Sequence, residues 1–242
     1  MGTTEFWEDH FVQRQDRGRR PSDLPDCLRP AVERALDHFG DLNNRKIIDL
    51  GCGSGETSIF LAKCGASVIS VDLSSTAINI LSDYCRTNDI NNVFPTKMAA
   101  QDIASLGKVD FVFGSMILHH IEPFTDFTRA LKEVVGSEGK CFFWENNARS
   151  NLMMWFRKNV VGKYWIPKHG DDDEYPLTQG EICELEKHFS VRVEYPELLL
   201  FRMISTYLLR GHIEPPFSYL DRLFFRFDRI KKLSYWQYIL LS

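Results

Sequence analysis

Short apolar runs alternate with amphipathic segments along most of this chain. The apolar runs predict buried strands, and the segments whose apolar residues recur every three to four positions predict helices. Strands are expected near 46–50, 67–71, 92–96, 109–113 and 139–144. Helices are expected near 26–39, 56–64, 75–88, 125–135 and 179–189. This alternation is typical of a doubly wound α/β protein built on a parallel sheet.

Several residues indicate where these elements begin and end. Ser75 and Thr125 are expected as N-caps, because their side chains can accept a hydrogen bond from the first helical turn. Thr178 and Glu181 have the spacing of a capping box. The glycines that follow two of the helices predict their ends. These are Gly40 and Gly136. Two further strands, near 190–199 and 235–241, would complete a seven-stranded sheet.

The first strand runs directly into a glycine-rich turn with the spacing Gly51-x-Gly53-x-Gly55. Glycine permits positive φ and lets a ligand lie against the backbone, as in the cofactor-binding turns of doubly wound proteins. A dinucleotide-binding turn instead reads G-x-G-x-x-G and binds a pyrophosphate. Here Asp49 and Glu56 bracket the turn with negative charge. The turn therefore favours a cofactor that carries positive charge.

An acidic residue ends the second predicted strand. Asp72 follows Gly51 by 21 residues, close to the separation of about 20 expected for an acid that binds ribose hydroxyls. By itself Asp72 could also cap the helix that begins near Ser74 and Ser75. Its combination with the glycine turn favours a nucleoside site.

Three segments together resemble the class I S-adenosylmethionine-dependent methyltransferases. They are Asp49-Leu-Gly-Cys-Gly-Ser-Gly55, Val71-Asp72-Leu73-Ser74 and Asp110-Phe-Val-Phe-Gly-Ser-Met-Ile-Leu-His-His-Ile121. The resemblance covers about residues 40–145. It implies a Rossmann-like, seven-stranded, mostly parallel sheet whose last strand is antiparallel, with S-adenosylmethionine as the cofactor.

The resemblance also implies a set of cofactor-binding residues. The three glycines would line the methionine and ribose part of the cofactor, Asp49 would place its amino group, and Asp72 would bind the ribose hydroxyls. Leu73 would lie against the adenine. Ala99 occupies the position of the acid that usually holds the adenine edge, so Asp102 or backbone groups near Ala100 and Gln101 would replace it. The full set is Asp49, Gly51, Gly53, Gly55, Asp72, Leu73, Ala100, Gln101, Asp102 and Ser115.

Candidates for acid–base chemistry follow the fourth and fifth strands. His119 and His120 come just beyond the fourth strand, the end that faces the transferring methyl in this family. Histidine titrates near neutral pH and can serve as a general base, and His119 is the first choice. The alternative is that the pair packs and orients its loop. Glu145 would orient the acceptor, pair with Arg149 or anchor a loop.

The chain is expected to form one domain spanning 1–242, whose cofactor-binding core is 46–145. The segments outside the core are expected to cover it. The N-terminal cover, 1–45, begins with a polar lead-in that is either solvated or a lid using Phe6, Trp7 and Phe11. Substrate-cover insertions are expected at 146–178 and 202–232. No metal site is expected, because the acidic run 171–174 has the pattern of a solvated loop.

The second insertion contains a basic amphipathic pattern over 218–230, preceded by Pro215 and Pro216. The two prolines predict a rigid turn before a helix that starts at Ser218. The apolar face of this helix would cover the sheet or close the substrate pocket. The alternative is peripheral contact with a membrane or a lipid-linked acceptor.

Composition narrows the class of protein. Of the 242 residues, 44% are hydrophobic and 26% charged, which is ordinary for a globular protein. The net charge of −4 argues against a nucleic-acid partner. The six scattered cysteines favour buried thiols in a reducing compartment. With neither a signal-peptide pattern nor a membrane-spanning run, we expect a cytoplasmic protein.

These features favour a methyltransferase that acts on a small molecule, with oxygen as the expected nucleophile. A natural-product, lipid-linked or sugar-type acceptor would fit equally. The alternatives are a non-catalytic or regulatory S-adenosylmethionine-binding protein, a nucleic-acid or protein methyltransferase, and a nicotinamide oxidoreductase. Relatives that use the bound sulfonium for other chemistry add a further alternative.

Overall fold

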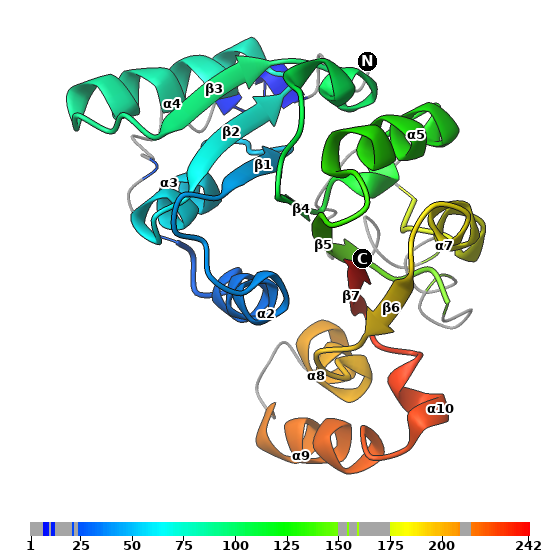
Figure 1. Cartoon of the computed structure of the whole chain (residues 1–242). Coiled ribbons are helices and arrows are strands. Elements are labelled where there is room, and N and C mark those ends of the chain that lie inside the picture. Colours follow the sequence, from blue (N-terminus) through cyan, green and yellow to red (C-terminus); the bar gives the residue numbers. More distant parts are fainter. Residues whose placement is uncertain are drawn as a thin grey trace.

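A seven-stranded sheet forms the centre of the computed structural model, which describes residues 7–9, 11–12, 21, 24–149, 154, 159, 175–208 and 214–242 (Figure 1). The strand order is β3-β2-β1-β4-β5-β7-β6. Neighbours are parallel except β7, which is antiparallel to both β5 and β6. The strands are β1 (Lys46–Leu50), β2 (Ser67–Asp72), β3 (Val93–Lys97), β4 (Phe111–Ser115), β5 (Lys140–Asn146), β6 (Val191–Glu194) and β7 (Trp236–Leu241). The predicted doubly wound, mostly parallel sheet with an antiparallel last strand is confirmed.

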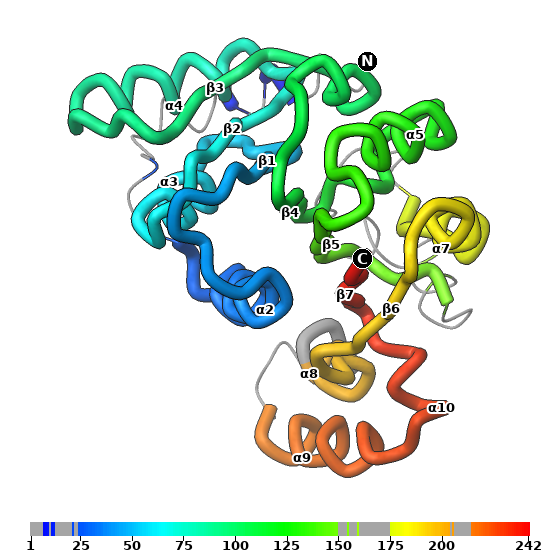
Figure 2. Tube along the Cα trace, in the orientation of Figure 1, coloured from blue at the N-terminus to red at the C-terminus, as the bar shows by residue number. Residues whose placement is uncertain are grey.

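Helices cover both faces of the sheet. One face carries α2 (Arg29–Phe39), α3 (Glu56–Lys63) and α4 (Ser75–Thr87). The other carries η1 (Ala100–Leu106), α5 (Phe124–Val135) and α7 (Gln179–Glu186). In Figure 2 the C-terminal strand β7 can be followed back into the sheet between β5 and β6.

Side chains alternate between two apolar cores along each central strand. Ile47 lies in the core under α2, α3 and α4, whereas Ile48 lies in the core under η1, α5 and α7. On β5, Phe142 and Phe143 divide in the same way, and each is 0% exposed. Both faces are therefore covered, which is why these strands read as continuous apolar runs. The rigid sheet places the loops after β1, β2 and β4 at one edge, where the site lies.

Most predicted helix ends agree with the structure. Thr178 and Glu181 form the capping box at α7, and Gly40 and Gly136 follow the ends of α2 and α5. The two predicted N-caps are wrong. Ser74, one residue before Ser75, caps α4 by accepting a hydrogen bond from Ala77 N. Helix α5 begins at Phe124, because the extended backbone of Pro123 sets its start before Thr125.

The predicted strand over 190–199 is wrong in length, because β6 ends at Glu194. Pro196 follows two residues later and cannot donate a backbone hydrogen bond to a neighbouring strand. The short 3-10 helices η1 and η2 (Leu118–His120) and helix α8 (Leu200–Leu208) had no counterpart among the predicted elements.

The region between β6 and β7 forms a separate lobe of helices α8, α9 (Glu214–Phe224) and α10 (Asp228–Lys231). The single helix predicted over 218–230 is wrong: α9 begins four residues earlier and ends before Phe227, whose backbone is extended. Pro215 and Pro216 belong to the first turn of α9, where backbone N–H groups have no intrahelical partner.

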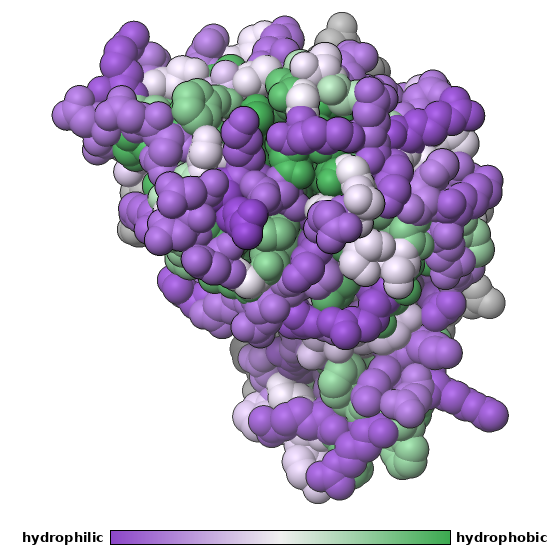
Figure 3. All heavy atoms as spheres, viewed as in Figure 1, coloured by the Kyte–Doolittle hydropathy of each residue, from purple (hydrophilic) through white to green (hydrophobic). Residues whose placement is uncertain are grey.

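The surface of this lobe mixes hydrophobic and hydrophilic side chains (Figure 3). Tyr219 and Phe227 are 59% and 58% exposed, and Asp221, which is buried, accepts hydrogen bonds from the backbone of Phe201 and Arg202 at the start of α8. Contact of 218–230 with a membrane or lipid stays a prediction. None of the described helices is long and apolar enough to cross a membrane.

All six cysteines lie within the described residues and carry free thiols. Cys52, Cys85 and Cys141 are buried, as expected for core elements, and the other three are exposed. Burial raises the pKa of the three buried thiols. Lead-in residues such as Phe6, and the acidic run 171–174, lie outside the described residues.

Candidate functional site

The glycine turn connects β1 to α3 at the carboxyl edge of the sheet. Gly55 is the N-cap of α3 with φ +90°, and a Cβ added there would lie 2.3 Å from Leu81 Cδ1. Only glycine lets α3 start this close to α4. Gly51 and Gly53 line the cavity beside the turn.

A cavity of about 660 Å³ lies where β1, β2 and β4 end. Ten of the expected site residues line it: Asp49, Gly51, Gly53, Asp72, Leu73, Ala100, Gln101, Ser115, His119 and His120. Gly55, Asp102 and Glu145 do not line it. Asp102 is exposed on η1, so Ala100 and Gln101 are the better placed of the candidates for the adenine edge.

Asp72 organises the edge of the cavity. Its Oδ2 accepts a hydrogen bond from Gly53 N at 2.9 Å, and its Oδ1 accepts one from Ser74 N at 2.8 Å. It thus joins the glycine turn to the start of α4. Burial raises the pKa of Asp72, although the backbone hydrogen bonds from Ser74 and Gly53 oppose this shift. The two oxygens together have about four lone pairs, so the carboxylate can still accept a hydrogen bond from a ligand hydroxyl.

Asp49 is buried beneath the glycine turn. Ser58 Oγ donates to its Oδ2 at 2.5 Å, and Ser70 Oγ donates to Ser58 Oγ at 2.7 Å. Burial raises the pKa of Asp49 to about 7, with Asp72 and Glu56 adding to the increase. A cation beside Asp49 would stabilise its ionised form and so offset the effect of burial.

The negative charge around the turn is therefore concentrated where water is excluded. The pKa of the buried Cys52 thiol is raised first by burial and then by Asp72 and Asp49. Such a field disfavours a pyrophosphate and favours a cofactor with a sulfonium and an ammonium group. The cavity's charge and its paired carboxylates thus fit S-adenosylmethionine.

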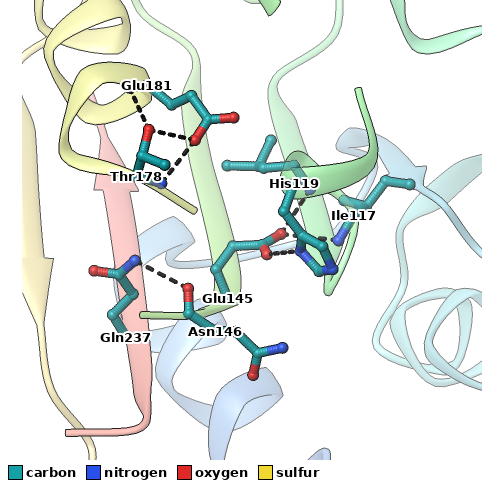
Figure 4. A network of polar contacts seen from close by, with 8 residues as sticks. Ile117, His119, Glu145, Asn146, Thr178, Glu181 and Gln237 are labelled. Atoms are coloured by element: carbon teal, nitrogen blue, oxygen red, sulfur yellow. Dashed lines mark hydrogen bonds and ion pairs between the residues drawn. The ribbon is translucent and has the colours of Figure 1, made fainter. Parts of the chain in front are cut away.

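Glu145 lies at the end of β5, and its side chain is 0% exposed (Figure 4). Its Oε1 accepts hydrogen bonds from Ile117 N at 2.8 Å and Leu118 N at 2.7 Å, and its Oε2 lies 2.5 Å from His119 Nδ1. The carboxylate therefore fixes the loop after β4 together with the His119 ring. The expected pairing with Arg149 is wrong. Direct orientation of an acceptor by Glu145 stays a prediction, and the contacts seen here are those of a loop-anchoring carboxylate.

Arg149 instead donates to Tyr195 Oη at 3.0 Å and to Gln179 Oε1 at 2.5 Å. These contacts tie the start of the 146–178 segment to α7 and to the residues after β6. Asn147 also holds this segment, because its Nδ2 donates to Ser234 O at 2.9 Å.

The two histidines form part of an aromatic wall. The ring centroids of His119 and His120 are 4.1 Å apart, and Trp7 meets His120 edge-on at 5.5 Å. Trp7 and Phe11 both line the cavity. This placement supports the lid hypothesis for the lead-in over the solvated alternative as far as the described residues extend.

Sequence reasoning missed Glu8, which lies between these aromatic residues and contacts the start of α4. A lone carboxylate in a polar lead-in carries no signal of a partner 67 residues away. It also missed Met98 and Ile117 as lining residues. Both follow strands, so their position at the carboxyl edge was the available signal.

The sheet order, glycine turn and terminal acid of β2 define a doubly wound protein that binds a nucleoside cofactor. A family model described as a methyltransferase domain matches residues 20–184. The chain belongs to the S-adenosylmethionine-dependent methyltransferases of class I. S-adenosylmethionine is its cofactor.

Two similar proteins are distant in sequence. A ubiquinone biosynthesis O-methyltransferase of Rickettsia bellii is 23% identical over 182 residues, which cover 74% of this chain and 75% of that protein. The enzyme of the same name from Rickettsia canadensis is 22% identical, covering 81% of this chain and 86% of that one.

Solved structures with similarly low sequence identity share the fold. An S-adenosylmethionine-dependent methyltransferase from Anabaena variabilis has a TM-score of 0.60 at 18% identity, covering 81% of this chain and 86% of that one. Magnesium protoporphyrin IX methyltransferase from Synechocystis, solved with S-adenosylhomocysteine, has a TM-score of 0.55 at 20% identity, covering 79% and 90%.

Proposed function

We propose that this enzyme methylates an oxygen atom of a small-molecule acceptor, with His119 as the general base. The observation that carries the proposal is the 2.5 Å contact between His119 Nδ1 and the buried Glu145 carboxylate, beside the cofactor cavity. A hydroxyl needs a base when it becomes a nucleophile, whereas a neutral amine does not. A histidine held by a carboxylate supplies that base near neutral pH.

The cofactor would be held by residues around the glycine turn. S-adenosylmethionine supplies, when bound, a methyl group on an electrophilic sulfonium. Asp72 would accept the ribose hydroxyls, Asp49 would face the amino group, and Leu73 would lie against the adenine. Glu145 fixes the loop that follows β4, so the same loop positions both the cofactor wall and His119.

The His119–Glu145 pair determines which ring nitrogen can act as the base. When Nδ1 carries the ring proton, it donates to Glu145 Oε2 and leaves Nε2 as an acceptor. Nε2 then takes the proton of the acceptor hydroxyl, and the Glu145 carboxylate stabilises the imidazolium that forms. Alignment of the acceptor within the cavity supplies much of the remaining rate.

The acceptor is proposed to be flat or largely apolar, because Trp7, Phe11, Pro25 and Leu28 are among the residues that line the cavity. The names of the Rickettsia relatives place those enzymes in ubiquinone biosynthesis, as O-methyltransferases. They support an oxygen nucleophile here and leave natural-product, lipid-linked and sugar-type acceptors as candidates.

We expect methyl transfer to hydroxyl acceptors. The test incubates the enzyme and S-adenosylmethionine with matched phenols, catechols, sugar hydroxyls, amines and thiols that share one aromatic or alkyl frame. S-adenosylhomocysteine and the methylated product are measured by mass spectrometry. The control is the same reaction without an acceptor. Turnover confined to the amine or thiol members, or to protein or nucleic acid added to the panel, would contradict the proposal.

We also expect S-adenosylmethionine binding to release a proton from Asp49 near pH 7. Because burial raises the pKa of this carboxyl to about 7, part of it is protonated there, and a cation beside it lowers the pKa. In the unliganded protein the folded-state pKa lies above the unfolded value. Asp49's contribution to stability therefore falls as the pH rises from about 3.8 to about 7, and then stays constant.

Calorimetry at pH 7 in phosphate and in Tris measures this release, because the two buffers differ in their enthalpy of protonation. The observed binding enthalpies should differ for the wild type and agree for Asp49→Asn. Equal enthalpies in both buffers for the wild type would show that Asp49 does not change its ionisation on binding.

A further inference from the structure

We propose that Glu8 is a positioning residue that holds Trp7 and Phe11 at the cofactor cavity and links them to Asp72 through Ser74. Its carboxylate lies at the N-terminus of α4. Oε1 accepts a hydrogen bond from Ser75 N at 2.7 Å, and Oε2 accepts from Ser74 Oγ at 2.9 Å and Thr76 N at 3.1 Å. Glu8 thus binds the first turn of a helix that begins 67 residues later in the sequence.

The residues on either side of Glu8 are those that line the cavity. Trp7 and Phe11 are four positions apart, so they share one face of a helical turn. Phe11 is 5% exposed, and a Cβ added to Gly53 would lie 3.2 Å from its ring. Trp7 meets His120. With Glu8 bound to α4, the two rings therefore line the cavity beside the glycine turn.

Ser74 joins Glu8 to the ribose acid. Its Oγ donates to Glu8 Oε2, and its backbone N donates to Asp72 Oδ1 at 2.8 Å. The same Asp72 carboxylate holds Gly53 N. A change in the Glu8 contact therefore acts on the backbone that presents Asp72 to the cofactor. The proposal rests on the cofactor site described above and extends it to a second carboxylate that does not line the cavity.

The contact between Glu8 and α4 is expected to persist across the neutral range. Burial raises the pKa of Glu8, but the hydrogen bonds from Ser75, Ser74 and Thr76 outweigh it and lower the pKa to about 2. Because this lies below the ordinary value of 4.5, the interaction is present above pH 4.5 and is lost as the pH falls toward 2. Nearby charges are Asp72 and Lys97, whose Nζ contacts Ser75 Oγ.

The experiment measures the dissociation of S-adenosylhomocysteine by stopped flow, with affinity from calorimetry. Glu8→Gln keeps the size of the side chain and removes its charge, and we expect dissociation roughly tenfold faster or more, because hydrogen bonds to a charged group are the stronger ones. The rate of dissociation should rise, while the thermal midpoint of the unliganded protein should stay close to that of the wild type. Asp9→Asn, an exposed neighbour that loses the same charge, is the matched control.

Ser75→Pro tests the contact from the α4 side. It removes the N–H that donates to Glu8 Oε1, and proline suits the first helical position. The preceding Ser74 is already extended, with φ −76° and ψ 119°, as a residue before proline should be. We expect faster dissociation here too, with an effect that is not additive with Glu8→Gln because both weaken the same contact between Glu8 and the start of α4.

The outcomes separate the inference from the function itself. Wild-type dissociation rates for Glu8→Gln and Ser75→Pro, or an equal change in Asp9→Asn, would contradict the proposed role of Glu8. They would not contradict the methyltransferase function. Absence of S-adenosylhomocysteine binding by the wild type would instead contradict the cofactor site. If Glu8→Gln fails to fold, Ser75→Pro alone decides, because it leaves the carboxylate in place.

Discussion

Asp72→Ala is expected to weaken S-adenosylhomocysteine binding by about 100-fold or more, since two hydrogen bonds to a charged group contribute roughly 1.5–3 kcal/mol each. The ribose hydroxyls would lose their acceptor. Gly53 N and Ser74 N would also lose the carboxylate that holds them, so the glycine turn would be less ordered before the cofactor binds. Isothermal calorimetry measures the loss directly and needs no acceptor.

The control is Asp83→Ala, which removes an exposed carboxylate from helix α4, the element that follows Asp72, where Asp83 pairs with Arg86 at 2.8 Å. Asp72→Asn separates charge from shape, because its amide oxygen can still accept one of the two backbone hydrogen bonds. Circular dichroism checks that each variant is folded. Near-wild-type affinity of a folded Asp72→Ala protein would show that Asp72 does not bind the cofactor and acts only on the turn.

The cofactor half of the site was predictable because its signals are local. A strand, a glycine turn and a helix follow one another within residues 46–63, and Asp72 ends the next strand. Parallel strands bring such ends to one edge of the sheet. Thus Gly53 and Asp72 were assigned from spacing and Asp49 from the resemblance, and the structure brings all three to one cavity.

The catalytic half was only partly predictable, because its contacts join distant segments. Nothing in the sequence distinguishes a carboxylate that meets Arg149, four residues away, from one that meets Ile117, Leu118 and His119. Only the pairing of β4 with β5 places Glu145 behind the β4 loop. Glu8 is a similar case, since its partner is the start of α4.

The C-terminal lobe shows a different limit. Pro215 and Pro216 predicted a turn, yet they occupy the first turn of α9, where their missing N–H groups cost nothing. The apolar spacing over 218–230 fitted one long helix, although Phe227 is extended and 58% exposed. Periodicity identifies a face but does not report where the backbone leaves the helix.

His119→Gln is expected to lower kcat by about 10²- to 10⁴-fold, the range for loss of a general base, with the affinity for S-adenosylmethionine little changed. The reason is that Nε2 would no longer take the hydroxyl proton, whereas Asp72 and the glycine turn remain. Turnover of the best hydroxyl acceptor from the panel, over a range of pH, measures the effect. The fall in wild-type activity at acid pH should be absent in the variant.

Glu145→Gln tests how the ring is positioned. A glutamine oxygen can still accept from Ile117 N and Leu118 N, but its NH₂ would then face His119 Nδ1 and donate to it. The ring proton would move to Nε2, the wrong nitrogen for a base, so kcat should fall while the fold and the cofactor affinity persist.

Two further histidine variants decide between base and packing roles. His188→Gln, near the end of α7 and away from the cavity, controls for the loss of an imidazole. His120→Gln should lower kcat less than His119→Gln, because the Glu145 carboxylate contacts the His119 ring at 2.5 Å and orients it. If His120→Gln abolishes turnover and His119→Gln changes only stability, the roles are reversed: His119 and Glu145 then anchor the loop, and His120, which meets Trp7, is the base.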